Sequence, residues 1–176
     1  LALVLVDALD LHVEQRVDVE IDAHAAAHLG IEATLVVELD VTELAPEPGV
    51  VGRLTELSVF DPLGDQVGRV RDVVVTFSLT RTRPRVIGLV VEVPGRRRVF
   101  VPMTRVTSVE GGQVITTGLV NMRRFEQRGN ETLVVAELFE RPVEVLTEEG
   151  GLVDATVEDV GIEQHGSRGW SVARAF

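Results

Sequence analysis

Two histidines near the start of the chain have the spacing of a metal-binding pair. His24 and His28 lie four residues apart, so a helix would carry both imidazoles on one face, where Asp22 or Glu20 would add a carboxylate ligand for a divalent metal. Two imidazoles do not make a metal site, and no other histidine is close to the pair in the sequence. We therefore expect an exposed turn at the pair, a surface position for His165, and no metal site.

Paired carboxylates are the second arrangement that could do chemistry, because a general acid and a general base need two carboxyl groups with separated pKa values in one pocket. Asp61 and Asp65 flank a tight turn, and Asp72 and Asp159 occupy equivalent points of two related units described below. A catalytic residue is rarely needed twice, whereas a residue that fixes strand geometry is. The residues to which we assign a structural role are Asp61, Pro62, Gly64, Asp65, Asp72, Gly150 and Asp159.

No nucleophile or phosphate-binding motif accompanies these carboxylates. The chain has no cysteine and no tyrosine, and the sequence contains no glycine-rich phosphate loop, serine nucleophile elbow or zinc signature. We therefore predict a protein without enzymatic activity and without a cofactor.

Arginine provides every basic side chain, because the sequence contains no lysine. A guanidinium group holds a phosphate or a carboxylate through two parallel hydrogen bonds. Aromatic residues make up only 4% of the chain, so there is little stacking surface for single-stranded nucleic acid. Solvated loops, docking of a protein, and binding of RNA or phosphate are three interpretations of the arginines. They form clusters at Arg81, Arg83 and Arg85, at Arg96, Arg97 and Arg98, and at Arg123, Arg124 and Arg128; we expect partner binding at Arg96, Arg97, Arg98, Arg123 and Arg124.

The chain of 176 residues is long enough for one ordinary domain or two small ones, and its 45% hydrophobic content is typical of globular proteins. Its net charge of −11 is concentrated at one end, because residues 1–50 contain eleven carboxylates and one arginine. No apolar run reaches the roughly 20 residues that cross a bilayer, and the start lacks the basic region of a signal peptide. A cytoplasmic location is the default expectation.

Residues 1–50 form an acidic extension with two alternating stretches, at 17–22 and 37–42, that predict strands. Pro46, Pro48 and Gly49 then mark a boundary before Val51. One interpretation is a genuine acidic extension. The other is upstream sequence translated from a start site assigned too early, with Val51 as the natural beginning.

Residues 51–117 predict a unit of short strands and tight turns. The turn at 61–65 contains aspartate, proline and glycine, each of which favours a turn for its own backbone reason, and the turn at 94–96 joins two strands as a hairpin. A meander of this kind indicates a small barrel. The expected strands are 57–60, 67–77, 86–93, 97–101, 107–109 and 114–115.

An arginine-rich connector at 118–136 separates this unit from a second one at 137–176, where a long strand is expected over 152–162. The order of features repeats, which implies two copies of one module. The second copy lacks its last hairpin, so either the module is incomplete or strands from residues 1–50 complete it. The residue pairs that we align are Val59 and Phe60 with Val145 and Leu146, Gly64 with Gly150, and Asp72 with Asp159.

The stretch at 57–75, from Leu57-Ser58-Val59-Phe60-Asp61-Pro62 to Asp72-Val73-Val74-Val75, resembles the opening of a PRC-barrel domain, and 84–93 and 100–103 continue the pattern. More narrowly, the stretches 96–106 and 117–126 are similar to actinobacterial magnesium transporter MgtE-like proteins. In those proteins a PRC-barrel region precedes an MgtE intracellular domain and CBS domains. The resemblance implies an all-β, small PRC-barrel-like fold for residues 52–176.

The resemblance also implies a function. We expect a non-catalytic interaction or regulatory module that is associated with magnesium transport or its regulation, and that docks onto a protein partner or onto C-terminal domains that this chain lacks. Such a module would be cytoplasmic, held at the cytoplasmic face of the membrane by its partner; any role for Mg²⁺ comes from the resemblance alone. The alternative is an RNA or ribosome-assembly adaptor resembling the PRC-barrel of RimM, although fold alone does not transfer function.

Overall fold

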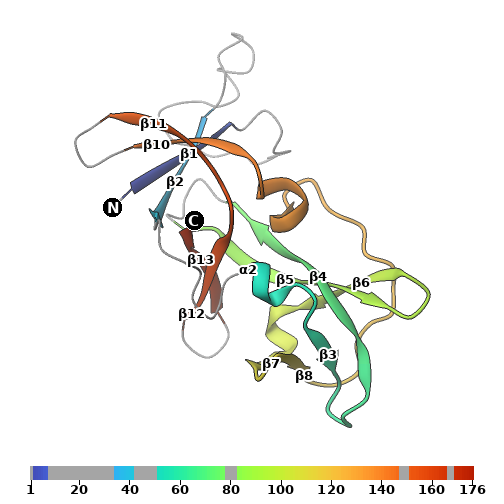
Figure 1. The fold of residues 1–176 in the computed structure, drawn as a ribbon. Helices are drawn as coiled ribbons and strands as arrows, with labels where there is room; N and C mark the ends of the chain where they lie inside the picture. The colour runs from blue at the N-terminus through green and yellow to red at the C-terminus, as the bar shows by residue number, and fades with distance from the viewer. Residues whose placement is uncertain (1, 8–33, 42–50, 78–82, 147–150, 166–168) are drawn as a thin grey trace.

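The computed structural model describes residues 2–7, 34–41, 51–77, 83–146, 151–165 and 169–176. The strand predicted at 17–22, the pair His24 and His28, and the turn residue Gly150 lie outside the described residues. The described chain is mostly β-strand and its sheet is strongly curled, which confirms the predicted all-β, barrel-like fold (Figure 1). Within the described ranges, no helix is long and apolar enough to cross a membrane.

The first unit is a curved sheet that follows a short helical turn. Its elements are α2 (Val51–Leu54), β3 (Ser58–Phe60), β4 (Gln66–Thr76), β5 (Arg85–Val93), β6 (Arg97–Pro102), a 3₁₀ turn η2 (Met103–Arg105), β7 (Val106–Glu110) and β8 (Gln113–Thr116). The order across the sheet is β6, β5, β4, β3, β8, β7, and only β3 and β8 run parallel. All six strands expected in this part of the chain are confirmed, with ends that differ by a residue or two.

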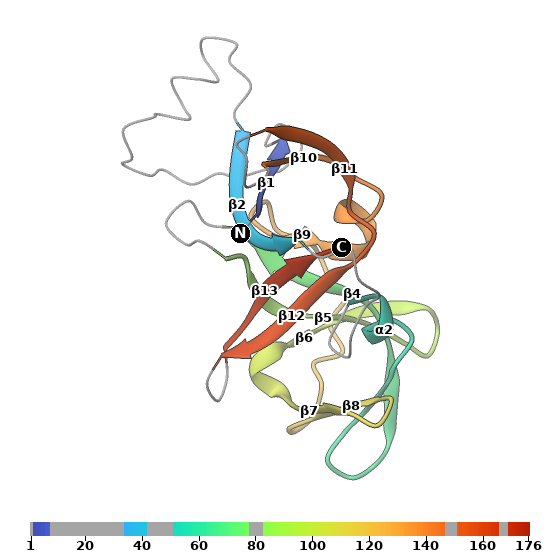
Figure 2. The same ribbon diagram turned by 60° about the vertical axis from the view of Figure 1, so that its left-hand side comes forward.

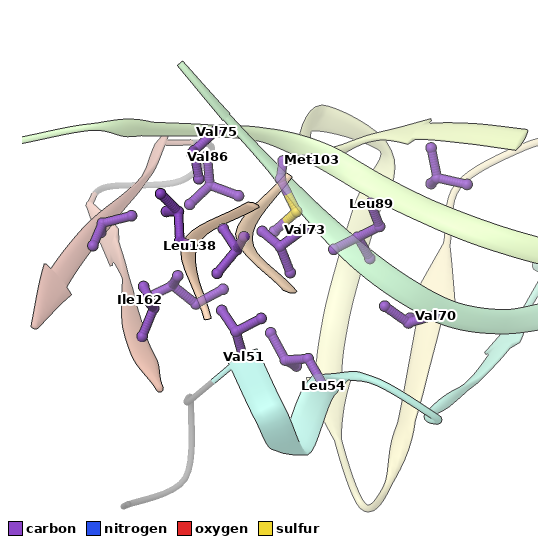
Figure 3. Close-up of a cluster of buried hydrophobic side chains, with 14 of the residues drawn as sticks. Val51, Leu54, Val70, Val73, Val75, Val86, Leu89, Met103, Leu138 and Ile162 are labelled. Atoms are coloured by element: carbon purple, nitrogen blue, oxygen red, sulfur yellow. The ribbon is translucent and has the colours of Figure 1, made fainter. Parts of the chain in front are cut away.

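β4 and β5 form a wall that the two units share. Valine is the commonest residue of both strands, and its branched Cβ suits a pleated sheet. Residues 72–75 are buried without a break, so both faces of β4 are covered. Figure 3 shows Val51 and Leu54 of α2 beside Val73 of β4, with Ile162 and Leu138 from the second unit completing the cluster. One hydrophobic core therefore spans both units.

The second unit repeats the order of a helical turn followed by antiparallel strands. Its elements are β9 (Thr132–Leu133), one turn of π-helix η3 (Val134–Leu138), β10 (Pro142–Leu146), β11 (Leu152–Thr156), β12 (Val160–His165) and β13 (Gly169–Ala175). β9, which pairs with β4, and the start of η3 fall within the stretch expected as a connector. The long strand expected over 152–162 is divided into β11 and β12, because the carbonyl of Phe176 accepts the N–H groups of both Glu158 and Asp159 and so interrupts the alternation of the ladder.

Two strands from the first fifty residues lie beside the second unit. β1 (Ala2–Asp7) pairs antiparallel with β10 and with β2 (Thr34–Val41), and the end of β2 runs parallel to the end of β13. The strand expected at 37–42 is thus part of β2. Figure 2 shows β1, β2, β10 and β11 curling around the end of the molecule opposite β7 and β8. This pairing matches the alternative in which strands of residues 1–50 complete the second unit.

Candidate functional site

The turn between β5 and β6 projects arginines into solvent. Gly95 and Arg96 adopt positive φ values of 85° and 57°, and the chain then returns as β6 with Val93 opposite Arg97. Arg96, Arg97 and Arg98 are all exposed. A left-handed conformation is costly for a residue with a Cβ, so the hairpin holds Arg96 at the tip through its strand pairing.

The segment after the first unit brings two more arginines to the same place. Arg124 forms an isolated antiparallel bridge with Val99, and the N–H of Phe125 donates to the carbonyl of Arg98 over 2.8 Å. Arg123 and Arg124 are exposed. The five residues expected to bind a partner therefore lie on two adjacent segments, and we call this group the basic surface: Arg96, Arg97, Arg98, Arg123 and Arg124.

An aromatic contact fixes the two segments against each other. The rings of Phe100 and Phe125 stack with centroids 5.9 Å apart. Phe100 also lies across Gly88 of β5, where a Cβ would come within 2.4 Å of two ring atoms. Only glycine at position 88 allows the ring to pack this closely. Sequence reasoning missed this contact, because the three residues are far apart in the chain and none belongs to a motif.

The register of the sheet places Glu92 opposite one residue of the basic surface, since Glu92 of β5 lies between Arg98 of β6 and Arg69 of β4. Arg71 donates to Glu92 over 2.9 Å and also bonds to Glu56. The hydrogen bond from Arg71, with the charges of Arg71 and Arg98, lowers the pKa of Glu92. Glu92 is therefore ionised at neutral pH, and it interacts both with Arg71 and with Arg98 and Arg96 of the basic surface.

Two apolar side chains accompany these arginines. Leu119 and Met122, on the segment that carries Arg123, are 80% and 44% exposed. Arg105 holds the start of this segment by donating to the carbonyl of Leu119 over 2.7 Å. The segment that carries Arg123 and Arg124 thus also exposes two apolar side chains.

The turn at 61–65 has the geometry that its residues suggest. Asp61 Oδ1 accepts the N–H groups of Leu63 and Asp65 over 2.9 and 3.0 Å, and Gly64 has a φ of 88°. Pro62 and Asp65 are exposed. The side chain of Asp61 thus closes the turn, as its predicted structural role requires.

Asp72 binds the helical turn of the second unit. Its carboxylate is 4% exposed and accepts the N–H groups of Val73 and Val135 at Oδ1, over 2.8 and 2.9 Å, and of Ala136 at Oδ2, over 3.1 Å. Val135 and Ala136 lie in the first turn of η3, whose N–H groups have no partner within the helix. Burial raises the pKa of Asp72, against the opposing effect of these hydrogen bonds.

Asp159 binds the helical turn of the first unit in the same way. Its Oδ1 accepts the N–H groups of Gly52, in α2, and of Val160 over 2.9 and 2.7 Å. A Cβ at residue 52 would lie 2.5 Å from Asp159 Oδ2, so glycine allows this approach. Each unit therefore caps the helical turn that opens the other one, a reciprocal contact that the sequence does not indicate.

The backbone around these turns repeats bond by bond. The N–H of Thr55 donates to the carbonyl of Val51, and the N–H of Phe139 donates to the carbonyl of Val134. The second bond spans one residue more than the first, which makes η3 a turn of π-helix. Glu56 and Glu140 both have positive φ, at 77° and 60°. Three more pairs of backbone hydrogen bonds are equivalent, each written from the N–H donor to the carbonyl acceptor. In the first unit they are Glu56 to Val70, Leu57 to Leu54 and Val70 to Leu57. In the second unit they are Glu140 to Val157, Arg141 to Leu138 and Val157 to Arg141.

This repeat corrects one of the alignments made from the sequence. Val59 lies opposite Gly68 and Val143 lies opposite Ala155, so Val59 corresponds to Val143 and not to Val145. The hairpin of β10 and β11 is longer than that of β3 and β4, which is why an alignment anchored at the turn glycines is out of register in the strand.

The other candidate residues do not gather into a site. His165 is exposed, and the part of the chain that the structure describes has no cluster of three or more histidine, aspartate or glutamate side chains placed to hold a metal. Arg81 lies outside the described residues. Arg83 is 3.9 Å from Glu163, and Arg128 is 3.9 Å from Glu131.

Comparison with known proteins gives one partial match. Residues 132–176 match a family described as Actinomycetes SH3 domain, and this stretch starts at β9 and includes η3 and β10 to β13. No curated protein matches the chain. The last part of the chain is therefore similar to a β-barrel domain of a binding type.

Proposed function

We propose that this protein is a non-catalytic β-barrel interaction module that docks an acidic protein partner on the basic surface. The observation that carries the proposal is the assembly of five exposed arginines from two segments of the chain, held in place by the stack of Phe100 on Phe125. Arginine forms bidentate hydrogen bonds with carboxylates, and opposite charges on two proteins speed and orient their encounter.

The similarity of residues 132–176 to an SH3-type family supports an interaction module in general terms. The resemblance to MgtE-like proteins supports a narrower form, in which the partner belongs to a magnesium transporter or regulates it. In this form the module acts by holding its partner, and it needs no Mg²⁺ of its own.

Charge reversal tests the proposal. The paired variants Arg97→Glu with Arg98→Glu, and Arg123→Glu with Arg124→Glu, should each lose a partner that the wild-type protein captures from native cell extract, and the captured proteins should have acidic contact regions. Arg53→Glu, on α2, is the matched control, because Arg53 is exposed but lies outside the basic surface. Unchanged thermal unfolding shows that the variants are folded. An identical set of partners for all the variants would refute the proposal.

Five arginines on one surface also suit RNA, the ligand of the alternative that resembles RimM. Filter binding against ribosomal RNA over a series of salt concentrations distinguishes the two, because phosphate contacts make the binding constant fall steeply with salt. Our proposal predicts that the protein does not bind RNA tightly in a salt-dependent way. It also predicts that capture of the protein partner survives treatment with nuclease.

A further inference from the structure

The two faces of β6 carry different arginines of the basic surface. Directly opposed residues of an antiparallel pair lie on the same face of a sheet. Arg97 is opposite Val93, which is buried in the hydrophobic core, whereas Arg98 is opposite Glu92. Arg97 therefore lies on the face that continues into the core, and Arg98 lies on the other face.

The packing of β6 agrees with this division. Val99 is buried in the core, whereas Phe100 stacks on Phe125 away from it. Side chains alternate between the two faces along a strand, so Arg97 shares a face with Val99, and Arg98 shares one with Phe100. We call the face of Val99 the core face and the face of Phe100 the outer face.

Arg124 joins Arg97 on the core face. Its bridge to Val99 places these two residues directly opposite each other, and Arg97 lies two positions before Val99 on β6. Residues in this diagonal relation are about 7–8 Å apart, within reach of long side chains. Arg97 and Arg124 are both exposed, so neighbouring acidic groups can contact both guanidinium groups at once. Arg123 lies outside the bridge, and the pairing therefore assigns it to neither face.

The outer face has a carboxylate of its own. Glu92 accepts a hydrogen bond from Arg71 over 2.9 Å, and the charges of Arg98 and Arg96 also act on it. An acidic group that approached Arg98 would therefore also meet the negative charge of Glu92. Like charges brought together at an interface are costly, so Glu92 weakens the outer face as a site for carboxylates.

The core face has no equivalent carboxylate. Among the residues that the structure describes, neither Arg97 nor Arg124 forms an ion pair. Glu126, two residues after Arg124, makes no ion pair with either of them. The positive charges of Arg97 and Arg124 are thus left for a group from outside the chain.

We propose that Arg97 and Arg124, on the core face, are the residues that bind the carboxylates of the acidic partner, and that Glu92 excludes those carboxylates from Arg98 and Arg96. This inference rests on the proposed function and names the half of the basic surface that recognises the partner. The partner should present two acidic side chains close together. Alternate residues of an extended segment fit, because they lie on one face about 7 Å apart.

Hexaglutamate labelled with fluorescein is the probe, and fluorescence anisotropy measures its binding to the whole chain at about 0.15 M salt, where distant charges are largely screened. Arg97→Gln and Arg124→Gln should each weaken binding by about threefold to fivefold, which corresponds to the loss of one exposed ion pair. Arg98→Gln and Arg96→Gln should each weaken it by less than about 1.5-fold, because these residues do not contact the probe.

Glu92→Gln tests the excluding role directly. Glutamine still offers an oxygen to Arg71 but carries no charge, so this variant should bind hexaglutamate about threefold more tightly than the wild type. A merely structural role of Glu92 would not strengthen binding. Arg53→Gln, on α2, is the matched control and should leave binding unchanged.

NMR spectroscopy of the arginine side chains then identifies the groups that bind. The Nε–H signals of Arg97 and Arg124 should shift when hexaglutamate is added, and those of Arg96 and Arg98 should stay in place. Equal losses for the four arginine variants, or weaker binding by Glu92→Gln, would overturn the division into two faces and leave the proposed function standing. A wild-type protein that does not bind hexaglutamate would overturn both.

Discussion

Replacing each of the two equivalent aspartates by asparagine should give unequal losses of stability. In Asp159, one oxygen, Oδ1, accepts both backbone N–H groups, and the amide oxygen of asparagine can do the same. In Asp72 both oxygens accept, so asparagine would turn an NH₂ group toward the N–H of Ala136. Two donors then face each other at a buried position.

The expected magnitudes follow from these bonds. An unsatisfied buried donor costs about 1–3 kcal/mol, so Asp72→Asn should lower the free energy of unfolding by about 2 kcal/mol. For Asp159→Asn the bonds remain and lose only the strengthening by the charge at a half-buried position, so the cost should stay below about 1 kcal/mol. For a chain of this size about 2 kcal/mol corresponds to a decrease of about 4–8 °C in Tm.

Urea unfolding followed by Trp170 fluorescence and by circular dichroism measures both losses on the same scale, with Asp65→Asn, at an exposed turn, as the control. The order of the two losses is the critical result. If Asp159→Asn costs as much as Asp72→Asn, or more, then the second oxygen of Asp72 does not hold η3, and the reasoning from the reciprocal caps is wrong.

Two further predictions concern these caps, and a third concerns the strands from the first fifty residues. Gly52→Ala should lower the unfolding midpoint, because its Cβ would displace the carboxylate of Asp159; calorimetry checks this, and an unchanged midpoint would contradict it. Burial raises the pKa of Asp72 above its ordinary value of 3.8, so its contribution to stability is complete below that pH and is lost as the pH rises through the folded pKa. Urea titrations of wild type and Asp72→Asn should therefore differ less above the folded pKa than below it, and a difference that grows would show the wrong sign. Deleting residues 1–41 should speed hydrogen exchange in β10 and β13, which lose β1 and β2, more than in β4; equal acceleration everywhere would argue against this pairing.

Much of the first unit could be predicted from the sequence, because its signals are local. Runs rich in β-branched residues place β4 and β5, and the residues of the 61–65 turn close it through Asp61. The arginines of the basic surface could also be predicted to be exposed, because they occur as clusters of charged residues in a predicted turn and connector. That two clusters would meet depends on the bridge between Val99 and Arg124, which no local pattern encodes.

The contacts between the units could not be predicted, because they join residues that are far apart in the sequence. Asp72 and Asp159 are recognisable as a repeated pair, but their partners, Val135 and Gly52, lie 63 and 107 residues away. A repeat shows that two residues do the same thing. It does not show whether each acts within its own copy or across to the other one.

The reciprocal caps make the two units dependent on each other, and this bears on how the protein binds. If α2 separated from β12, Val51 and Leu54 would leave the shared core, and Gly52 would lose its acceptor. If η3 separated from β4, Asp72 would be left as a buried carboxylate without two of its three donors. Because either step exposes apolar surface on both units, the two units should keep a fixed distance and orientation. A partner that docks on the basic surface would then meet a preformed surface, so its binding should not have to order the two units against each other.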